Sequence, residues 1–295
     1  MFSFLPRLLH KKTVVTVQGL DWQRKKWGHF ASGVLRLGEQ AAIRFPNATM
    51  VVSRTLQEYF DRQYHAPTFY VPNGGTVREK RPLHHLPQWK LDPAHYILFL
   101  GRFSPEKNCH LLIQAYEQID TDVKLVLAGG SSHTTQYAQE LRTHACGRIV
   151  LLDWLSGDAL DELLTNAVLF VLPSDLEGLS LALLDAMGAG LCVLTSDIPE
   201  NCELVEGAGF TFKCGDVTDL ERMIRLLLAD SRVREEAGRS AREKIRTHYQ
   251  WSQITAEIER VYLSLLGESA APAVAEHFES SVKAIPTNER DRVAP

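Results

Sequence analysis

The sequence predicts an α/β fold in which parallel sheets are covered by helices, and two observations support this prediction. From residue 96 to residue 266, short apolar runs alternate with segments whose apolar residues recur at helical spacing. Such alternation is typical of a parallel sheet with helices on both faces. Residues 1–85 show the same alternation over only three strand-like runs. The sequence therefore predicts two α/β domains, the N-terminal one incomplete and the C-terminal one complete.

The expected elements of the C-terminal domain follow from this alternation. Short apolar runs of β-type composition predict strands at residues 96–100, 124–128, 149–152, 169–172, 191–195 and 209–212. Helices are expected between them, at 108–118, 133–145, 158–165, 179–190 and 198–205. Two or three more helices follow. One opens at Thr218-Asp-Leu-Glu221, which has the spacing of a capping box, and the last covers residues 251–266.

The N-terminal domain is predicted to cover residues 1–85. Its elements are expected to be strands at 13–17, 48–52 and 68–71 and helices at 31–43 and 55–62. The segment 72–93 is rich in proline and has linker composition, so it marks the boundary. The domain that follows is predicted to cover 94–250, and the helix 251–266 to cross back to the first domain. Residues 267–295 are expected to form a flexible tail, because they combine Ala, Pro, Ser and charge with little periodicity.

Composition and charge argue against several classes of binding partner. The 295 residues include 32 Lys and Arg against 36 Asp and Glu, a net charge of −4. This near balance argues against a nucleic-acid partner, so any bound anion must be held by a local site. The five cysteines form no CxxC pair, which predicts reduced thiols in the cytoplasm and no metal site. No apolar run reaches the ~18 residues that cross a bilayer, so membrane contact is expected to be peripheral at most.

Four unusual loops follow predicted strands of the C-terminal domain. In a parallel sheet, ligands bind beyond the carboxyl ends of the strands, so these loops are expected to meet at one edge. They are Gly101–Asn108, Gly129–Ser132, Asp153-Trp154 and Pro173–Ser180. Each loop is a weak signal alone, and their arrival at one edge is the stronger observation.

Two cations in the first of these loops suit a diphosphate. Arg102 offers a planar fork of donors, and Lys107 offers a mobile point charge. Lys107 also lies near a predicted helix start, where free backbone N–H groups favour anions. The alternative interpretation is that both residues are solvated surface charges.

An acidic pair, Glu177 and Asp185, encloses the segment Gly178-Leu179-Ser180 and the start of a predicted helix. Eight helical positions rise about 12 Å and return near the starting face, so the two carboxylates can reach opposite ends of one elongated ligand. Gly178 lets the backbone come close, and the N–H groups of Gly178, Leu179 and Ser180 are expected to point toward a bound anion. On spacing alone, a buried helix with an acidic N-terminal cap explains the pattern equally well.

With these motifs, residues 96–266 resemble the C-terminal nucleotide-binding domain of the family 4 retaining glycosyltransferases, whose GT-B fold has two Rossmann-like domains. The matching motifs are Gly101-Arg102 with Glu106-Lys107-Asn108, the Gly129-Gly130 turn, the Asp153-Trp154 loop and the acidic-x7-acidic motif. Residues 11–75 resemble the end of that family's N-terminal domain, through Thr16–Trp22, Val51–Ser53 and Val71–Gly74. The resemblance implies a GT-B-like chain whose N-terminal domain is truncated.

The resemblance also implies a role for each matching residue. Arg102 and Lys107 would neutralise the donor diphosphate and stabilise the leaving nucleotide, and Glu177 would meet the donor sugar. These three are the candidate catalytic residues. Asp185 would hold the ribose hydroxyls, and the Asp153-Trp154 loop would lie along the base. The candidate donor-binding residues are Gly101, Arg102, Lys107, Asp153, Trp154, Glu177, Gly178, Leu179, Ser180 and Asp185.

The implied reaction is the transfer of a sugar from a nucleotide-diphosphate sugar to a glycan, lipid or small-molecule acceptor, with retention of anomeric configuration. The nucleotide sugar is a co-substrate. The resemblance implies no cofactor and no metal, because protein cations and helix dipoles stabilise the developing charge.

The sequence departs from the family pattern in ways that keep a second hypothesis open. It starts late, which is compatible with a missing N-terminal segment or a partner chain. Gln18 stands where the family often has His, and glutamine cannot relay a proton. Asp185 replaces Glu and is one methylene shorter. The second hypothesis is therefore a non-catalytic nucleotide-sugar binder or the partner subunit of a split glycosyltransferase.

A nicotinamide-dependent oxidoreductase is a third hypothesis, since parallel sheets also carry that chemistry. No GxGxxG motif follows any predicted strand, which disfavours this hypothesis.

One further motif is open to two interpretations. Trp22 and Trp27 flank Arg24, Lys25 and Lys26. The cluster suits an acceptor or membrane-surface patch, or an ordinary loop with aromatic anchors.

Overall fold

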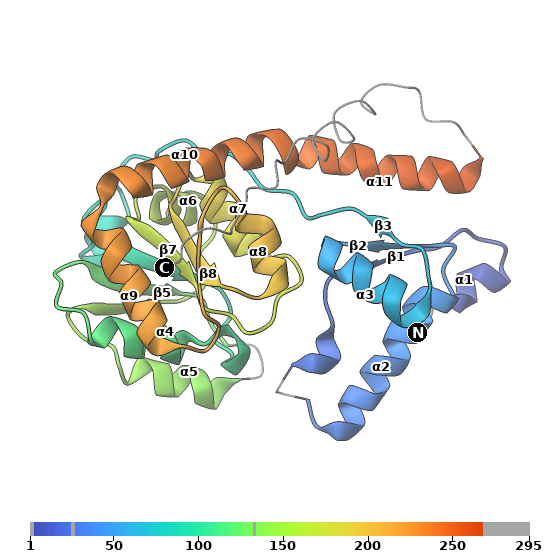
Figure 1. Cartoon of the computed structure of the whole chain (residues 1–295), viewed down its shortest axis with the longest axis horizontal. Helices are drawn as coiled ribbons and strands as arrows, with labels where there is room; N and C mark the ends of the chain where they lie inside the picture. The colour runs from blue at the N-terminus through green and yellow to red at the C-terminus, as the bar shows by residue number, and fades with distance from the viewer. Residues whose placement is uncertain (1–2, 25–26, 132–133, 268–295) are drawn as a thin grey trace, which may run out of the picture.

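The computed structural model describes residues 3–24, 27–131 and 134–267. The chain forms two lobes, each built on its own parallel sheet, as Figure 1 shows. The predicted α/β class with parallel sheets is therefore confirmed. The predicted tail, 267–295, lies outside the described residues apart from Gly267.

The small lobe contains a three-stranded parallel sheet in the order β1-β2-β3. Its elements are α1 (Phe4–Leu8), β1 (Val14–Val17), the 3-10 turn η1 (Asp21–Gln23), α2 (His29–Arg44), β2 (Ala48–Val51), α3 (Arg54–Tyr64) and β3 (Phe69–Tyr70). Helix α3 begins where the hydroxyl of Ser53 accepts a hydrogen bond from the amide of Leu56 at 3.2 Å. This contact satisfies one of the free amides of the first turn.

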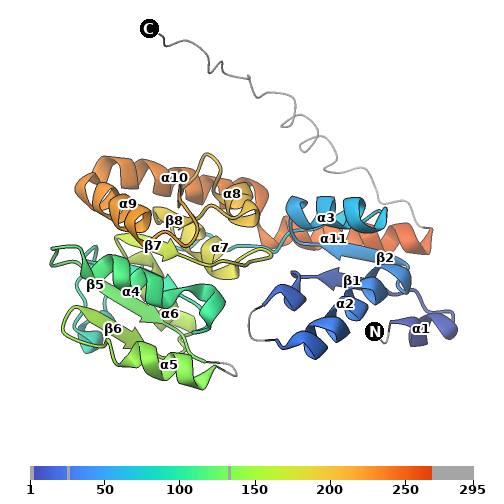
Figure 2. The same cartoon turned by 60° about the horizontal axis from the view of Figure 1, so that its bottom comes forward.

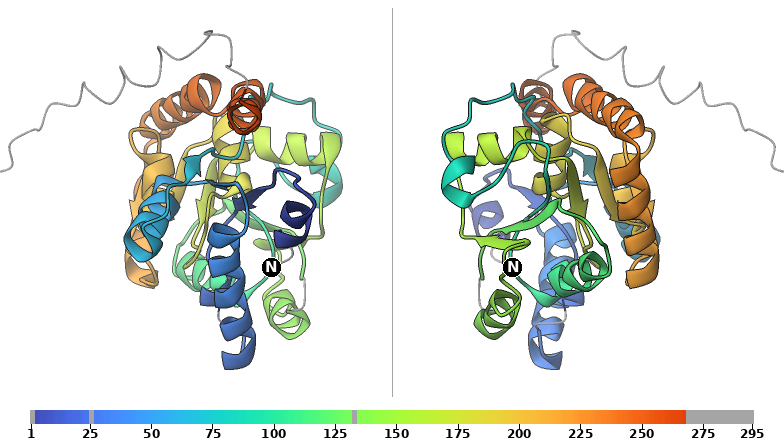
Figure 3. Two further views of the ribbon diagram at one scale, coloured as in Figure 1. Left: turned by 90° about the vertical axis from the view of Figure 1, so that its right-hand side faces the viewer. Right: turned by 90° about the vertical axis from the view of Figure 1, so that its left-hand side faces the viewer.

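The large lobe contains a six-stranded parallel sheet in the order β6-β5-β4-β7-β8-β9. Its strands are β4 (Tyr96–Leu100), β5 (Lys124–Ala128), β6 (Ile149–Leu152), β7 (Leu169–Leu172), β8 (Val193–Ser196) and β9 (Phe210–Phe212). Its helices are η2 (Leu86–Trp89), η3 (Pro105–Lys107), α4 (Cys109–Glu117), α5 (Thr135–Arg142), α6 (Gly157–Thr165), α7 (Leu181–Gly188), α8 (Pro199–Val205), α9 (Val217–Ala229) and α10 (Ser231–His248). Helices cover both faces of this sheet (Figures 2 and 3).

The central strands of the large lobe are buried along their whole length. All five residues of β4 and all four of β7 are buried, which is why both strands read as unbroken apolar runs. Tyr96 is the one residue of β4 with a polar side-chain atom, and its hydroxyl donates to the carbonyl of Leu163 at 2.6 Å. The core therefore lies between this sheet and its helices.

The last helix, α11 (Trp251–Leu266), leaves the large lobe and runs along the small one (Figure 1). Its side chains Ile254 and Val261 pack with Ala48 and Met50 of β2 and with Val71, which directly follows β3. The linker meets the start of this helix, because the amide of Gly75 donates to the carbonyl of Tyr249. The small lobe is thus covered by a helix that follows the large lobe in sequence.

A carboxylate of the large lobe also caps a helix of the small lobe. Glu203 in α8 accepts hydrogen bonds from the backbone amides of Arg54, at 3.0 Å, and Thr55, at 3.3 Å. These amides begin α3, where free N–H groups favour a negative charge. Glu203 therefore connects α8 to α3 across the boundary between the lobes.

The predicted capping box at Thr218 is wrong. The N-cap of α9 is Asp216, whose carboxylate accepts from the amides of Thr218 and Asp219, both at 3.1 Å. One aspartate thus satisfies two amides of the first turn, so the helix begins at Val217 and Thr218 lies inside it.

A search of the described helices finds none that is long and apolar enough to cross a membrane.

Candidate functional site

The carboxyl ends of β4 and β7 lie side by side in the middle of the large sheet. The strand order reverses here, because β5 and β6 extend beyond β4 on one side and β8 and β9 extend beyond β7 on the other. Such a switch point opens a crevice where α/β proteins bind ligands. Loops 101–108 and 173–180 leave the sheet at this point, and the amide of Asp175 donates to the carbonyl of Glu106 at 2.9 Å. The two loops are therefore in contact.

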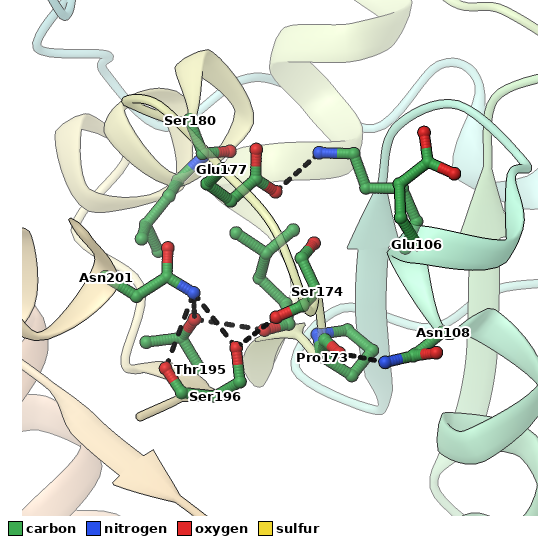
Figure 4. Close-up of polar contacts among 12 residues, drawn as sticks. Glu106, Asn108, Pro173, Ser174, Glu177, Ser180, Thr195, Ser196 and Asn201 are labelled. Atoms are coloured by element: carbon green, nitrogen blue, oxygen red, sulfur yellow. Dashed lines mark hydrogen bonds and ion pairs between the residues drawn. The ribbon is translucent and has the colours of Figure 1, made fainter. Parts of the chain in front are cut away.

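Lys107 and Glu177 form a nearly buried ion pair between these loops. The ammonium Nζ lies 2.5 Å from the carboxylate Oε1, and the side chains are only 11% and 9% exposed. Figure 4 shows the carboxylate of Glu177 with this contact as a dashed line. Because both groups have lost most of their water, each is held in place mainly by the other. The structure thus brings together a cation and a carboxylate from two predicted loops.

Arg102 supplies a second cation in the first loop. Its side chain is half-buried and has neither an ion-pair nor a hydrogen-bond partner among the described residues. An uncompensated guanidinium near a switch point favours the binding of an anion.

Glu106 connects the loop 101–108 to the small lobe, through a contact that the sequence did not predict. Its side chain is 2% exposed, and Arg24 of the small lobe lies 3.3 Å from its Oε1. Burial by itself would raise the pKa of Glu106, but its own backbone N–H and the charge of Arg24 outweigh burial and lower this pKa. The residue preceding Lys107 is therefore a charged carboxylate that an arginine of the opposite lobe neutralises.

Gly178 lies in direct contact with the other lobe. A Cβ atom at this position would overlap the backbone carbonyl of Gln18. The side chain of Gln18 is nearby as well, because the amide of Asn73 donates both to its Oε1, at 3.1 Å, and to the carbonyl of Leu179, at 3.3 Å. Gln18, which stands where the family often has His, thus lies against the acidic motif.

Helix α7 starts directly after this contact. The hydroxyl of Ser180 accepts from the amide of Leu183 at 3.4 Å, so Ser180 is its N-cap. Leu179 is buried, with 8% exposure. The segment 178–180 therefore presents backbone groups at the helix start, as an anion site requires.

Asp185 is paired with a linker residue. Nη1 of Arg78 lies 2.7 Å from its Oδ1, and Nε of the same arginine lies 2.8 Å from Asp161. Burial raises the pKa of Asp185 despite the attraction of Arg78. The sequence did not indicate Arg78, because the linker and α7 are far apart along the chain.

The Asp153-Trp154 loop meets the Gly129-Gly130 turn, as the shared sheet edge predicts. A Cβ atom on Gly130 would lie 2.6 Å from the indole nitrogen of Trp154, so the ring passes directly over this glycine. The ring is 57% exposed. The carboxylate of Asp153 instead turns to Arg142, at 2.8 Å. Trp154 therefore offers an open aromatic surface at the strand ends, and Asp153, whose side chain is 85% exposed, forms a surface ion pair through Oδ1.

A buried polar network supports the loop that carries Glu177 (Figure 4). Ser196 donates to the carbonyl of Ser174 at 2.5 Å, and the amide of Asn201 donates to Thr195 at 2.6 Å and to Ser196 at 3.1 Å. These side chains are all buried. Such a fully enclosed network holds its members rigidly, so it fixes where the loop leaves β7. Sequence reasoning missed this network, and its only signal was Thr195-Ser196 at a strand end.

Within the described parts of the chain, no group of three or more His, Cys, Asp and Glu side chains is placed to hold a metal ion.

Comparison with known proteins decides the family. The family described as "Glycosyl transferases group 1" matches residues 87–244, more than half of the 295-residue chain. The chain belongs to this glycosyltransferase family. The predicted membership of family 4 is thereby confirmed, and the family consists of enzymes.

Curated relatives agree with this family. The chain is 31% identical over 170 residues to sulfoquinovosyl transferase SQD2 of Arabidopsis thaliana, covering 55% of this chain and 32% of that protein. It is 27% identical over 250 residues to alpha-maltose-1-phosphate synthase of Mycobacterium tuberculosis, covering 76% of this chain and 65% of that protein. The chain thus spans from about a third to two thirds of the length of these relatives.

Solved structures confirm the GT-B-like fold. HepE of Anabaena in complex with UDP-glucose has a TM-score of 0.79 at 19% identity, covering 89% of this chain and 75% of that one. Sucrose-phosphate synthase of Thermosynechococcus elongatus has a TM-score of 0.76 at 21% identity, covering 90% and 72%.

Proposed function

We propose that this chain binds a nucleotide-diphosphate sugar beyond β4 and β7 and transfers the sugar to an acceptor with retention of anomeric configuration. The observation that carries the proposal is the nearly buried pair of Lys107 and Glu177, together with the half-buried Arg102, which belongs to the same loop as Lys107 and has no side-chain partner among the described residues. Family membership supports the reaction class. The structural neighbour HepE was solved with UDP and with UDP-glucose.

The proposed reaction develops negative charge on the diphosphate. The bond from the anomeric carbon to the diphosphate oxygen breaks, and that oxygen keeps the electron pair. The acceptor hydroxyl attacks the same face, and its proton passes to the departing oxygen. Arg102 and Lys107 stabilise the charge that appears on the diphosphate. Glu177 uses Oε1 to hold Lys107, which leaves Oε2 to accept a hydrogen bond from a sugar hydroxyl.

The remaining donor contacts are assigned in the same way. The backbone of Gly178, Leu179 and Ser180 lies at the start of α7 and suits the anion. Asp185 is proposed to hold the ribose hydroxyls through Oδ2, because Arg78 engages its Oδ1. The open ring of Trp154 is proposed to lie along the base.

The acceptor is proposed to be a glycan, a lipid or a small molecule. We also propose a reducing compartment such as the cytoplasm, because all five cysteines are free thiols.

Calorimetry with UDP and UDP-glucose, alongside an assay for sugar release and transfer, tests the donor site. Lys107→Ala is expected to weaken the binding of UDP and of UDP-glucose, and Glu177→Gln the binding of UDP-glucose, by at least about tenfold, since a contact to a charged group contributes about 1.5–3 kcal/mol. Lys124→Ala is the matched control, because Lys124 begins β5 at the opposite end of the sheet.

The outcomes separate three cases. Binding with transfer, reduced by both variants and not by the control, supports the enzyme. Binding without transfer supports the non-catalytic binder or partner subunit. Equal binding by wild type, Lys107→Ala and Glu177→Gln would show that the donor lies elsewhere.

A further inference from the structure

One face of helix α7 extends from the crevice to the linker between the lobes. Leu181, Asp185 and Gly188 are spaced four and three positions apart, so they share this face. Leu181, in the first turn after the segment 178–180, is exposed. At the other end of the face, a Cβ atom on Gly188 would lie 2.1 Å from the backbone carbonyl of Thr76. Asp185 therefore lies between the crevice end of α7 and the linker, which packs directly against the helix.

The linker is fixed at its contact with α7. It runs from β3 to the large lobe, as Figure 1 shows. The amide of Gly75 donates to the carbonyl of Tyr249 at 2.6 Å, and the amide of Arg78 donates to the carbonyl of Gly188 at 3.0 Å. The backbone of Arg78 is therefore held at the C-terminal end of α7, and its side chain starts from a defined position.

The guanidinium of Arg78 lies between two carboxylates of the large lobe. Nη1 lies 2.7 Å from Oδ1 of Asp185 in α7, and Nε lies 2.8 Å from Oδ1 of Asp161 in α6. The side chain of Arg78 is only 14% exposed, and that of Asp185 is 27% exposed. The planar guanidinium presents its donors in a fixed geometry. Asp161 therefore orients the group that holds Asp185.

The same contacts affect the charge of Asp185. Burial and the charge of Asp161 raise the pKa of Asp185, whereas the charge of Arg78 and its hydrogen bond lower this pKa. Among the described residues, Arg78 is the only cation that pairs with this carboxylate. Without Arg78, burial and the like charge would act unopposed, and the negative charge of Asp185 would be harder to maintain.

A short carboxylate needs a fixed orientation to act as a selective acceptor. Arg78 engages Oδ1 of Asp185, and the proposed donor site uses Oδ2 for the ribose. A binding side chain keeps a productive geometry only when neighbouring groups lock its rotamer. Arg78 is the neighbour that can supply this constraint, because its own position is fixed by Asp161 and by the backbone of α7.

We propose that Arg78 is a positioning residue for the donor site and orients Asp185 so that this carboxylate selects the ribose hydroxyls of the nucleotide. This inference rests on the proposed function and deepens it, because it assigns ribose selectivity to a residue of the linker. Arg78 acts through Asp185, and Asp161 acts through Arg78. Removal of Arg78 is therefore expected to reduce the preference for ribose more than the binding of the diphosphate.

Calorimetry on the full chain with matched nucleotides tests this proposal. UDP carries both ribose hydroxyls, and 2′,3′-dideoxy-UDP carries neither. GDP and ADP are measured beside UDP with their dideoxy forms, and the ratio of the two affinities is read on the nucleotide that binds most tightly. The wild type is expected to prefer the ribose form at least about tenfold, since its hydroxyls donate to a charged acceptor. In Arg78→Met the preference should fall to about twofold, because an unoriented carboxylate gains little over water.

Two further variants separate positioning from a general effect on folding. Arg81→Met is the matched control, because Arg81 pairs with the same Asp161, at 3.1 Å, and with Asp158 rather than Asp185. Its ribose preference should equal that of the wild type. Arg78→Lys keeps a cation but loses the planar fork that reaches both aspartates, so its preference should be intermediate, about fourfold. If Arg78→Met does not fold, the comparison is read from Arg78→Lys.

The ratio compares two ligands on one protein, so a general loss of stability weakens both and leaves the ratio unchanged. A preference that is lost in Arg78→Met, partly kept in Arg78→Lys and unchanged in Arg81→Met supports the proposal. Equal ratios in the wild type and both Arg78 variants overturn it, as does a wild type without ribose preference or an equal loss in Arg81→Met. Failure of the proposed function appears separately, as absent heat with all three nucleotides.

Discussion

The two lobes bury their hydrophobic cores in different ways. The large lobe encloses β4 and β7 completely between its own helices. The small lobe has only three strands and borrows cover from elsewhere. One part of its core, Val51, Val52, Leu56 and Phe60, belongs to the same cluster as the large-lobe core. Another part, Ala48, Met50 and Val71, is covered by α11. The core of the small lobe therefore depends on contacts with elements that follow it in sequence, whereas the core of the large lobe does not.

The largest expected effect on the contact between the lobes comes from a substitution at Gly178. Gly178→Ala places a methyl group against the backbone carbonyl of Gln18, which cannot move aside as a side chain would. Overpacking of this kind costs about 1–3 kcal/mol. We expect UDP affinity to fall by roughly tenfold, because the lobes must separate, while the unfolding of the large lobe is little changed. Calorimetry with UDP and a thermal scan measure the two effects.

Gly147→Ala is the control for that substitution, because a Cβ atom at Gly147 meets nothing within 4 Å. If both variants bind UDP like the wild type, the contact between Gly178 and Gln18 does not govern the crevice.

A smaller effect is expected at the cap that joins α8 to α3. Glu203→Ala removes the acceptor for the amides of Arg54 and Thr55. Loss of such a cap costs about 0.5–2 kcal/mol. Hydrogen exchange should accelerate in the first turn of α3 and not in β4. Glu206→Ala, at an exposed neighbouring position, should change neither. Uniform acceleration across both lobes would mean that the small lobe is not held separately.

The smallest effect concerns pH and the pair of Arg24 and Glu106. The folded-state pKa of Glu106 lies below its usual 4.5. Its carboxylate therefore stabilises the fold above pH 4.5, and this contribution is lost as the pH falls through the folded-state pKa. Glu106→Gln should flatten the decline in the free energy of unfolding below pH 4.5. Urea unfolding at several pH values checks this, and parallel curves for both proteins would contradict it.

The sequence predicted much of the fold because strand composition and helical spacing are local properties. Five-residue apolar runs such as 96–100 correspond to buried parallel strands, and the last helix covers 251–266 as expected. The misplaced cap at Thr218 shows the limit of local patterns. Asp216 and Thr218 are both suitable N-cap residues, and they lie two positions apart. Only the backbone conformation shows that the carboxylate of Asp216 accepts from the free amides of the first turn.

The same distinction between local sequence pattern and tertiary packing applies to the candidate site. The chain alone determined that Lys107 and Glu177 follow strands of one parallel sheet, because strand direction carries loops to a common edge. Only the tertiary structure decided which groups pair. Arg24 meets Glu106 across 82 positions, and Glu203 meets Arg54 across 149. Such contacts depend on how the two lobes pack, and no spacing within a single element encodes that packing.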